Sequence, residues 1–216
     1  MPRLVFEKTG DSIWISHLDL MRVFQRAFRR AGLLLKHSQG FNPRAIVSIA
    51  LPLSVGVESS CELLDFELEQ PEPVTPERLN AVLPQGIRVL DVLENGRKLK
   101  ELTHLRARVT LTYDHGVPEH AAECICTLFR RESLVLEKRS KKGVSQVDIL
   151  PMITKLEVLQ EDDDTIVLEA AVCAQNPSLN PQQLAMAVEC YLPELTPDAV
   201  TIRREEVLDT EGRIFR

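Results

Sequence analysis

The chain has 216 residues, of which 44% are hydrophobic and 27% are charged, a composition typical of a globular protein rather than a disordered or fibrous one. No apolar run approaches the roughly 18 residues of a transmembrane helix, and the first ten residues lack the apolar core of a signal peptide. We therefore expect a cytoplasmic protein with no membrane partner. Charge is uneven, because residues 1–50 hold 8 Lys and Arg against 3 Asp and Glu although the whole chain has a net charge of −6. An anionic partner is expected for one face only.

The first half of the chain predicts six elements in the order β-α-β-β-α-β. They are a strand at Arg3–Lys8, a helix capped by Ser16 that stops at Gly32, strands at Ile46–Leu51 and Cys61–Glu69, a short helix from Thr75-Pro76 to Leu83, and a strand at Gly86–Leu93. This order is typical of a ferredoxin-like unit.

The second half predicts a similar series of elements. Strands are expected at Leu105–Tyr113, Ser133–Arg139, Lys155–Gln160, Thr165–Cys173 and Val200–Val207, and helices at Pro118–Arg130 and after Asn180-Pro181. An extra strand or hairpin is expected around 141–151, beside a basic turn at Lys138–Gly143. The fold class predicted is α+β, with tandem ferredoxin-like (βαββαβ) lobes at residues 1–97 and 98–216 and antiparallel sheets.

Four arginines share one face of the first predicted helix. Arg22, Arg26, Arg29 and Arg30 lie at i, i+4, i+7 and i+8, opposite the apolar positions. Guanidinium groups pair bidentately with phosphate, so this face can form a surface for RNA or another polyanion. The alternative is a solvated helix face whose arginines favour the negative C-terminal end of the helix.

The loop after this helix adds further nucleic-acid-binding candidates, namely Lys36, His37, Phe41, Asn42 and Arg44. Gly40 and Pro43 give the loop a restricted geometry. Phe41 can stack on a base, but we expect it to anchor the loop in the core instead. His17 and His37 are the weak catalytic candidates, as general acid or base. His17 and Asp19 do not face one another on a helix, and capping accounts for Asp19. No spacing of residues predicts a metal site.

Four of these segments carry a resemblance to a known family. Ser16–Asp19 (SHLD), Arg29-Arg30, Gly40–Pro43 (GFNP) and Pro52–Ser59 resemble the motifs of a bacterial family of uncharacterised radical-SAM-linked proteins, with the strongest match over residues 3–70. That family usually has a histidine and a proline after GFNP, where this chain has Arg44 and Ala45. The resemblance implies an accessory protein fused to, or encoded beside, a radical-SAM protein, near genes for an RNase E/G-type nuclease and ribosomal proteins.

The chain is not expected to be the radical-SAM enzyme itself. Its five cysteines, at 61, 124, 126, 173 and 190, form no three-cysteine cluster for an iron–sulfur centre, and no cofactor is expected.

We expect a non-catalytic module rather than an enzyme. It would present the basic helix and loop to structured RNA or a ribosome-related ribonucleoprotein, for a radical-SAM partner. Two alternatives remain open. One is an RNA-processing enzyme similar to the endoribonucleases that cut CRISPR repeat RNA, although the tail at 203–216 lacks their glycine-rich loop. The other is a protein–protein adaptor, in which the acidic residues 151–216 dock a basic partner without RNA.

Overall fold

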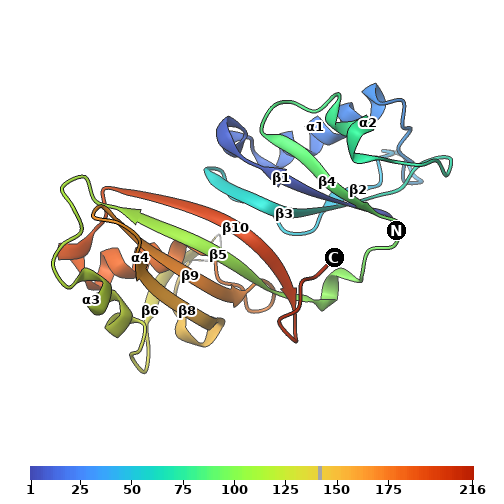
Figure 1. Ribbon diagram of the computed structural model, residues 1–216. Coiled ribbons are helices and arrows are strands. Elements are labelled where there is room, and N and C mark those ends of the chain that lie inside the picture. Colours follow the sequence, from blue (N-terminus) through green and yellow to red (C-terminus); the bar gives the residue numbers. More distant parts are fainter. Residues whose placement is uncertain (141–142) are drawn as a thin grey trace. The chain divides into compact units, whose positions relative to one another are not determined.

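The computed structural model describes residues 1–140 and 143–216 (Figure 1). These residues divide into two compact units: unit 1 comprises Met1–Glu101 and Ile214–Arg216, and unit 2 comprises Leu102–Arg213. Each unit combines helices with a sheet whose described strand pairings are antiparallel, so the predicted α+β class is confirmed. Within the described part of the chain, no helix is long and apolar enough to cross a membrane.

Unit 1 contains the predicted β-α-β-β-α-β series. Its elements are β1 (Arg3–Lys8), the 3-10 turn η1 (Gly10–Trp14), α1 (His17–Arg30), β2 (Val47–Ile49), β3 (Val57–Phe66), α2 (Pro76–Asn80), β4 (Ile87–Leu93) and the 3-10 turn η2 (Leu99–Glu101). In the sheet, β1 lies between β4 and β3, and β2 pairs with the end of β3. The strand order within the unit is therefore β4-β1-β3-β2.

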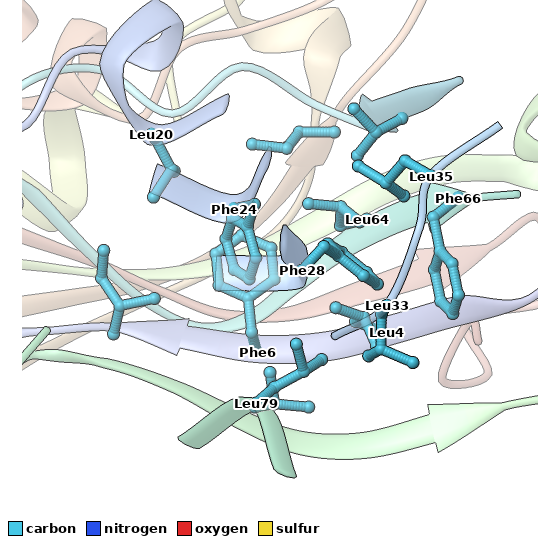
Figure 2. Close-up of a cluster of buried hydrophobic side chains, with 14 residues drawn as sticks. Leu4, Phe6, Leu20, Phe24, Phe28, Leu33, Leu35, Leu64, Phe66 and Leu79 are labelled. Carbon is cyan, nitrogen blue, oxygen red and sulfur yellow. The ribbon is translucent and has the colours of Figure 1, made fainter. Parts of the chain in front are cut away.

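The core of unit 1 lies between α1 and the sheet (Figure 2). Leu20, Phe24 and Phe28 recur every four residues, so they form one stripe along α1 and are buried. The Phe24 ring packs edge-on against Phe6 of β1, with 4.6 Å between the ring centroids. This packing fixes which face of α1 is buried and leaves its opposite face to solvent.

A buried ion pair lies on the other side of the β1 strand. The Arg3 guanidinium is 2% exposed and binds Asp65 through two bonds, Nε to Oδ1 at 2.6 Å and Nη2 to Oδ2 at 3.0 Å. It also lies over the ring of Phe215, 5.3 Å from the centroid, and Phe215 itself is fully buried. Residues 214–216 thus complete the structure of unit 1, although they follow the last strand of unit 2.

Unit 2 has the same strand order with a hairpin inserted. Its elements are β5 (Leu102–Thr112), α3 (Ala121–Leu128), β6 (Val135–Ser140), β7 (Gly143–Asp148), the 3-10 turn η3 (Leu150–Met152), β8 (Ile153–Gln160), β9 (Thr165–Cys173), α4 (Gln182–Tyr191), the 3-10 turn η4 (Pro193–Leu195) and β10 (Ala199–Asp209). The sheet order is β10-β5-β9-β8, and among the described residues β6 and β7 pair with each other in a separate hairpin. The predicted extra hairpin falls in this region, and part of the basic turn, Lys141 and Lys142, lies outside the described residues.

Two arginines on the polar face of the unit 2 sheet are paired with carboxylates of the same unit. Alternation along β5 buries Val109 and Leu111 and leaves Arg106 and Arg108 on the other face. The Arg108 guanidinium binds Glu169 at 3.0 Å and also Glu161, and the hydrogen bond to Glu161 is the main reason that the pKa of Arg108 is raised. Arg106 lies 3.6 Å from a carboxylate oxygen of Glu205. These arginines therefore already have anionic partners.

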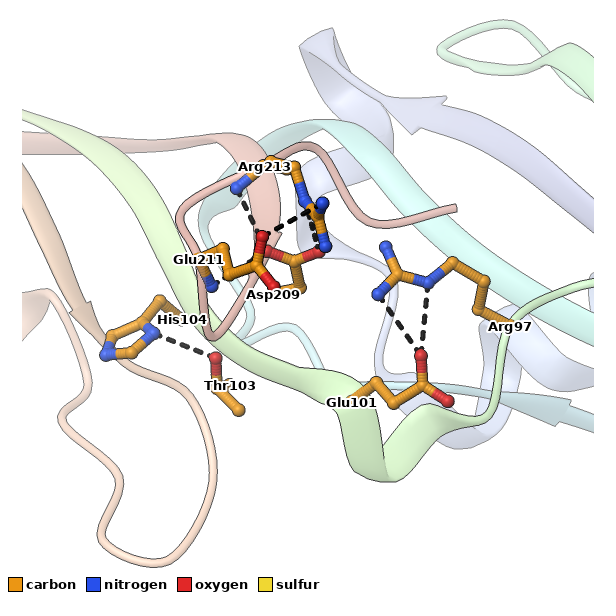
Figure 3. A network of polar contacts seen from close by, with 7 residues as sticks. All are labelled: Arg97, Glu101, Thr103, His104, Asp209, Glu211 and Arg213. Atoms are coloured by element: carbon orange, nitrogen blue, oxygen red, sulfur yellow. Dashed lines mark hydrogen bonds and ion pairs between the residues drawn. The ribbon is translucent and has the colours of Figure 1, made fainter.

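A tight turn ends unit 2 (Figure 3). The buried Asp209 accepts hydrogen bonds on Oδ1 from the backbone amides of Glu211 and Arg213, both at 3.0 Å. Its Oδ2 lies 3.2 Å from Nε of Arg213, whose guanidinium also binds Glu211 at 2.9 Å. The side chain of one aspartate thus determines the path by which the chain leaves β10.

Some element boundaries differ from the sequence prediction. Strand β3 begins at Val57 rather than Cys61, because Lys8 of β1 pairs with Ser59 and extends the ladder into a polar segment. It also ends at Phe66 rather than Glu69. Strand β2 is shorter than expected, since only Val47–Ile49 pairs continuously with β3. Helix α3 begins at Ala121 rather than Pro118, after His120 in a left-handed conformation.

Candidate nucleic-acid interface

The start of α1 is fixed by its cap, as the sequence predicts. The Ser16 hydroxyl accepts a hydrogen bond from the backbone amide of Asp19 at 3.2 Å and donates to the Asp19 carboxylate at 2.8 Å. The bond from Ser16 is the largest influence that lowers the pKa of Asp19, and the hydrogen bond from Arg22 acts in the same direction. Asp19 is therefore a stable carboxylate at the beginning of the helix.

The four predicted arginines of α1 are all exposed on the face opposite the core. We call Arg22, Arg26, Arg29 and Arg30 the arginine face. Because the helix rises 1.5 Å per residue, this face extends for about 12 Å along the axis. Predicting this arrangement needed only the helical period and the position of the apolar residues.

The members of the arginine face differ in what they bind. Arg22 forms an exposed ion pair with Asp19 at 2.8 Å, one helical turn away. The Arg30 guanidinium donates to the backbone carbonyl of Val82, in the segment after α2, and so has a structural contact. Among the described residues, Arg26 and Arg29 form no hydrogen bond or ion pair through their side chains. These two guanidinium groups are the ones available to an external anion.

The loop predicted after α1 is an ordered hairpin, which we call the GFNP hairpin (residues 36–46). The Ile46 amide donates to the Lys36 carbonyl at 2.7 Å, and the Ser38 amide donates to the Arg44 carbonyl at 2.8 Å. The Ser38 hydroxyl accepts from the Arg44 amide at 3.1 Å, and His37 and Ala45 form a bridge between the two arms. The tip at residues 39–43 is thus held at both ends, with Gly40 at a φ of 133° that favours glycine.

The side chains of the GFNP hairpin point mainly to solvent. Phe41 has a relative exposure of 106%, so the expectation that it anchors the loop in the core is wrong. Lys36 is paired with Glu67 at 2.9 Å, whereas the exposed side chain of Arg44 has no hydrogen bond or ion pair among the described residues. His37 and Asn42 are also exposed. The hairpin therefore offers one unpaired cation and one open aromatic ring.

The predicted residues lie in two groups within unit 1. One group is the arginine face and the other is the GFNP hairpin, and in the described structure no hydrogen bond or ion pair joins the two. A cavity of about 650 Å³ in the same unit is lined by Phe66, Pro71, Val74 and neighbouring residues and includes none of the predicted site residues. The candidate interface is therefore a surface rather than a pocket.

The two histidines occupy different environments. His17, in the first turn of α1, is half-buried, and its Nδ1 has no hydrogen-bond partner in the described structure. His37 is exposed on the GFNP hairpin. No group of three or more His, Cys, Asp or Glu side chains within residues 1–140 and 143–216 has an arrangement that could hold a metal ion.

Sequence reasoning missed an exposed apolar group at the N-terminal end of α1. Trp14, Leu18 and Val55 are exposed by 68%, 69% and 52%, respectively. The Gly56 amide donates to the Ile13 carbonyl at 3.0 Å, which joins the segment of Val55 to that of Trp14. The available signal was a lone tryptophan two residues before a helix cap, within a stretch that otherwise reads as a connection.

Comparison with protein families gives one match. Residues 2–181 match the model of an uncharacterised protein family conserved in bacteria, DUF2344. The chain belongs to this family. None of the curated proteins matches it.

Two solved structures of RNA–protein particles have a similar fold. One is from an H/ACA ribonucleoprotein bound to a substrate RNA containing 2′-deoxyuridine, with 10% identity, a TM-score of 0.51, and coverage of 95% of this chain and 47% of that chain. Another is from an archaeal box H/ACA Nop10–Cbf5 complex, with 11% identity, a TM-score of 0.50, and coverage of 94% and 46%. This chain spans about half the length of those proteins, and the likeness concerns the fold.

Proposed function

We propose that the chain is a non-catalytic RNA-binding module that serves a radical-SAM protein. The arginine face and the GFNP hairpin contact phosphates of structured RNA or of a ribonucleoprotein. The observation that carries this proposal is that the exposed side chains of Arg26, Arg29 and Arg44 form no hydrogen bond or ion pair in the described structure, in contrast to Arg106 and Arg108 of unit 2.

Unpaired guanidinium groups are suited to phosphate for three reasons. They present a planar set of donors that matches two phosphate oxygens, and they are more weakly hydrated than ammonium groups. They also release the counterions condensed on nucleic acid, which makes binding favourable and salt-dependent. Arg106 and Arg108 of unit 2 are already bound to Glu161, Glu169 and Glu205, so these two guanidinium groups are less available to an external anion than Arg26, Arg29 and Arg44 of unit 1.

The fold comparison supports RNA as the polyanion. The similar structures belong to ribonucleoproteins, and one of them holds a substrate RNA. The strand orders β4-β1-β3-β2 and β10-β5-β9-β8 also support our proposal that residues 1–97 and 98–216 are two ferredoxin-like lobes.

The radical-SAM partner is inferred from the resemblance of Ser16–Asp19, Gly40–Pro43 and Pro52–Ser59 to the radical-SAM-linked proteins. Co-purification of this chain with the radical-SAM protein of the same bacterium tests that part of the proposal. A complex that survives nuclease treatment supports a direct contact, whereas loss of the complex would show that RNA alone joins the two.

The RNA proposal is tested with a double variant, Arg26→Ala with Arg29→Ala, in a filter-binding titration with structured RNA at several salt concentrations. Arg30 is left intact because it holds the Val82 carbonyl. We expect weaker binding for all RNA sequences, with a slope of log affinity against log salt that is smaller by about two.

The control is a second double variant with the same change in net charge, Arg130→Ala with Arg203→Ala, in which both arginines are exposed in unit 2. The control should bind RNA as the wild type does. If both variants lose the same RNA affinity, binding depends on the net charge of the chain rather than on this interface. Undiminished RNA binding by the Arg26/Arg29 variant would refute the proposed interface. A denaturing gel of the same mixtures shows whether the RNA is cut.

A further inference from the structure

Trp14 is an exposed side chain on an immobilised backbone. The indole is 68% exposed at the end of η1, two residues before the Ser16 cap of α1. Lys8 is only 1% exposed, and its ammonium group donates to the carbonyls of Ile13 at 3.0 Å and Ile15 at 2.8 Å. A buried cation therefore holds the residues on both sides of Trp14.

Further contacts hold the same turn. The Ser12 hydroxyl lies 2.8 Å from the carbonyl oxygens of both Thr9 and Gly86, and the Thr9 amide donates to the Gly86 carbonyl at 2.8 Å. The Gly56 amide donates to the Ile13 carbonyl at 3.0 Å. Backbone from three separate segments thus meets at η1, so its conformation is fixed before any ligand arrives.

Gly56 also determines how the indole lies. A Cβ atom at this glycine would be 3.4 Å from the Trp14 ring, which means that the ring rests against the Gly56 backbone. The φ of Gly56 is +83°, a value that side-chain-bearing residues rarely adopt. The indole is thus supported at Gly56 and remains largely open to solvent.

Leu18 and the arginine face follow Trp14 along α1. Leu18, Arg22, Arg26 and Arg29 recur at intervals of four, four and three residues, so they lie on one side of the helix. An open aromatic ring followed by cations is the arrangement with which proteins bind single-stranded nucleic acid, because bases stack on the ring while phosphates meet the cations. A protein partner would also cover an apolar ring, but Arg26 and Arg29 farther along the same side of α1, which form no hydrogen bond or ion pair in the described structure, favour an anionic ligand.

We infer that Trp14 is a stacking platform for an unpaired base of the RNA that the arginine face binds. This inference rests on the proposed function and specifies its substrate class: RNA that contains single-stranded nucleotides, in a loop, a bulge or a free end. Phosphates beyond the stacked base lie along Arg26 and Arg29, since Arg22 is paired with Asp19.

The experiment uses the fluorescence of the full chain, in which Trp14 is the sole tryptophan. Oligouridylate of about 12 nucleotides, within the range that one such surface binds, is compared with a blunt RNA duplex of the same length. We expect the single strand to quench Trp14 emission and the duplex to leave most of it unchanged. Heparin, a polyanion without bases, should compete with the RNA and restore the emission.

Variants separate this inference from the proposed function. Trp14→Ala should weaken binding of the oligouridylate by about 5- to 100-fold with an unchanged salt slope, because stacking is not ionic. Trp14→Phe should retain part of the affinity and exclude misfolding as the cause. The Arg26/Arg29 double variant should instead change the salt slope.

Two results would overturn the inference. Full RNA affinity in Trp14→Ala with unquenched emission in the wild type would remove Trp14 from the interface while the proposed function stands. A change of emission with the radical-SAM protein in the absence of RNA, without any change on adding RNA, would make Trp14 part of a protein-docking surface. Absence of all RNA binding would refute the proposed function as well.

Discussion

Tyr113 shows how burial of one side chain makes stability depend on pH. Its hydroxyl is buried and donates to the Leu195 carbonyl at 3.0 Å. Burial raises the pKa of Tyr113 to about 12, and the charge of Asp198 acts in the same direction. Because the unfolded chain releases this proton at a lower pH, the stabilisation is complete below about pH 10 and is lost as the pH rises towards 12.

Tyr113→Phe should therefore abolish this part of the pH dependence. We expect the variant to be less stable than the wild type at neutral pH, since it lacks the bond to Leu195. The difference should shrink by about 2–3 kcal/mol as the pH rises from about 10 to about 12. Urea unfolding followed by circular dichroism at each pH measures both quantities. A constant difference across that range would contradict the assignment.

For single residues, the sequence predicts which side chains are exposed better than it predicts which groups they bind. The spacing of Arg22, Arg26, Arg29 and Arg30 placed them on one exposed face, because the helical period depends on local geometry alone. The contact of Arg30 with the Val82 carbonyl and the pairing of Lys36 with Glu67 join residues far apart in sequence. No local pattern contains that information, so which cations remain free was not predictable.

Helix α1 depends on its cap, which can be tested separately from its arginines. Ser16→Ala removes the bond to the Asp19 amide and should destabilise the protein by about 1 kcal/mol. It should also raise the pKa of Asp19 towards the ordinary value, because the bond from Ser16 is the main cause of its lowering. The stabilisation associated with this carboxylate is present above its ordinary pKa and is lost as the pH falls through the lowered value.

Chemical denaturation measures the stability of this variant, and an NMR titration follows the carboxyl group. Ser16→Thr serves as the control, since threonine can accept the same bond and should preserve both properties. An unchanged Asp19 titration in Ser16→Ala would show that the cap does not set that pKa.

Among the elements, those with strong periodicity were predicted and those defined by pairing were not. The apolar stripe and cap of α1 are local signals, and the predicted start at Ser16 is confirmed. The first residues of β3, Val57–Ser60, are largely polar, and the pairing of Ser59 with Lys8 of β1 is a contact between distant residues that no local pattern shows. The GFNP hairpin was likewise expected as a loop, since its bridge between His37 and Ala45 involves too few residues for a period to be visible.

At the scale of the whole chain, Phe215 joins the C-terminal residues to unit 1. The ring is fully buried and contacts both Arg3 and Arg97. Phe215→Ala should destabilise unit 1 by about 3–5 kcal/mol, the usual cost of removing a buried aromatic side chain. Trp14 emission reports this directly, because the chain has no tryptophan in unit 2.

Phe41→Ala is the matched control for that measurement. It removes the same side chain from a fully exposed position and should leave the unfolding of unit 1 unchanged. If Phe215→Ala unfolds at the same denaturant concentration as the wild type, residues 214–216 are not needed for the stability of unit 1.

The discontinuity of unit 1 also has a consequence for biosynthesis. During translation, Arg3 and Asp65 are synthesised early. Phe215 is added only after all of unit 2 has been translated. The nascent unit 1 must therefore wait, with the guanidinium of Arg3 uncovered on one side, for more than a hundred further residues to be synthesised. Final closure of unit 1 is thus linked to completion of unit 2.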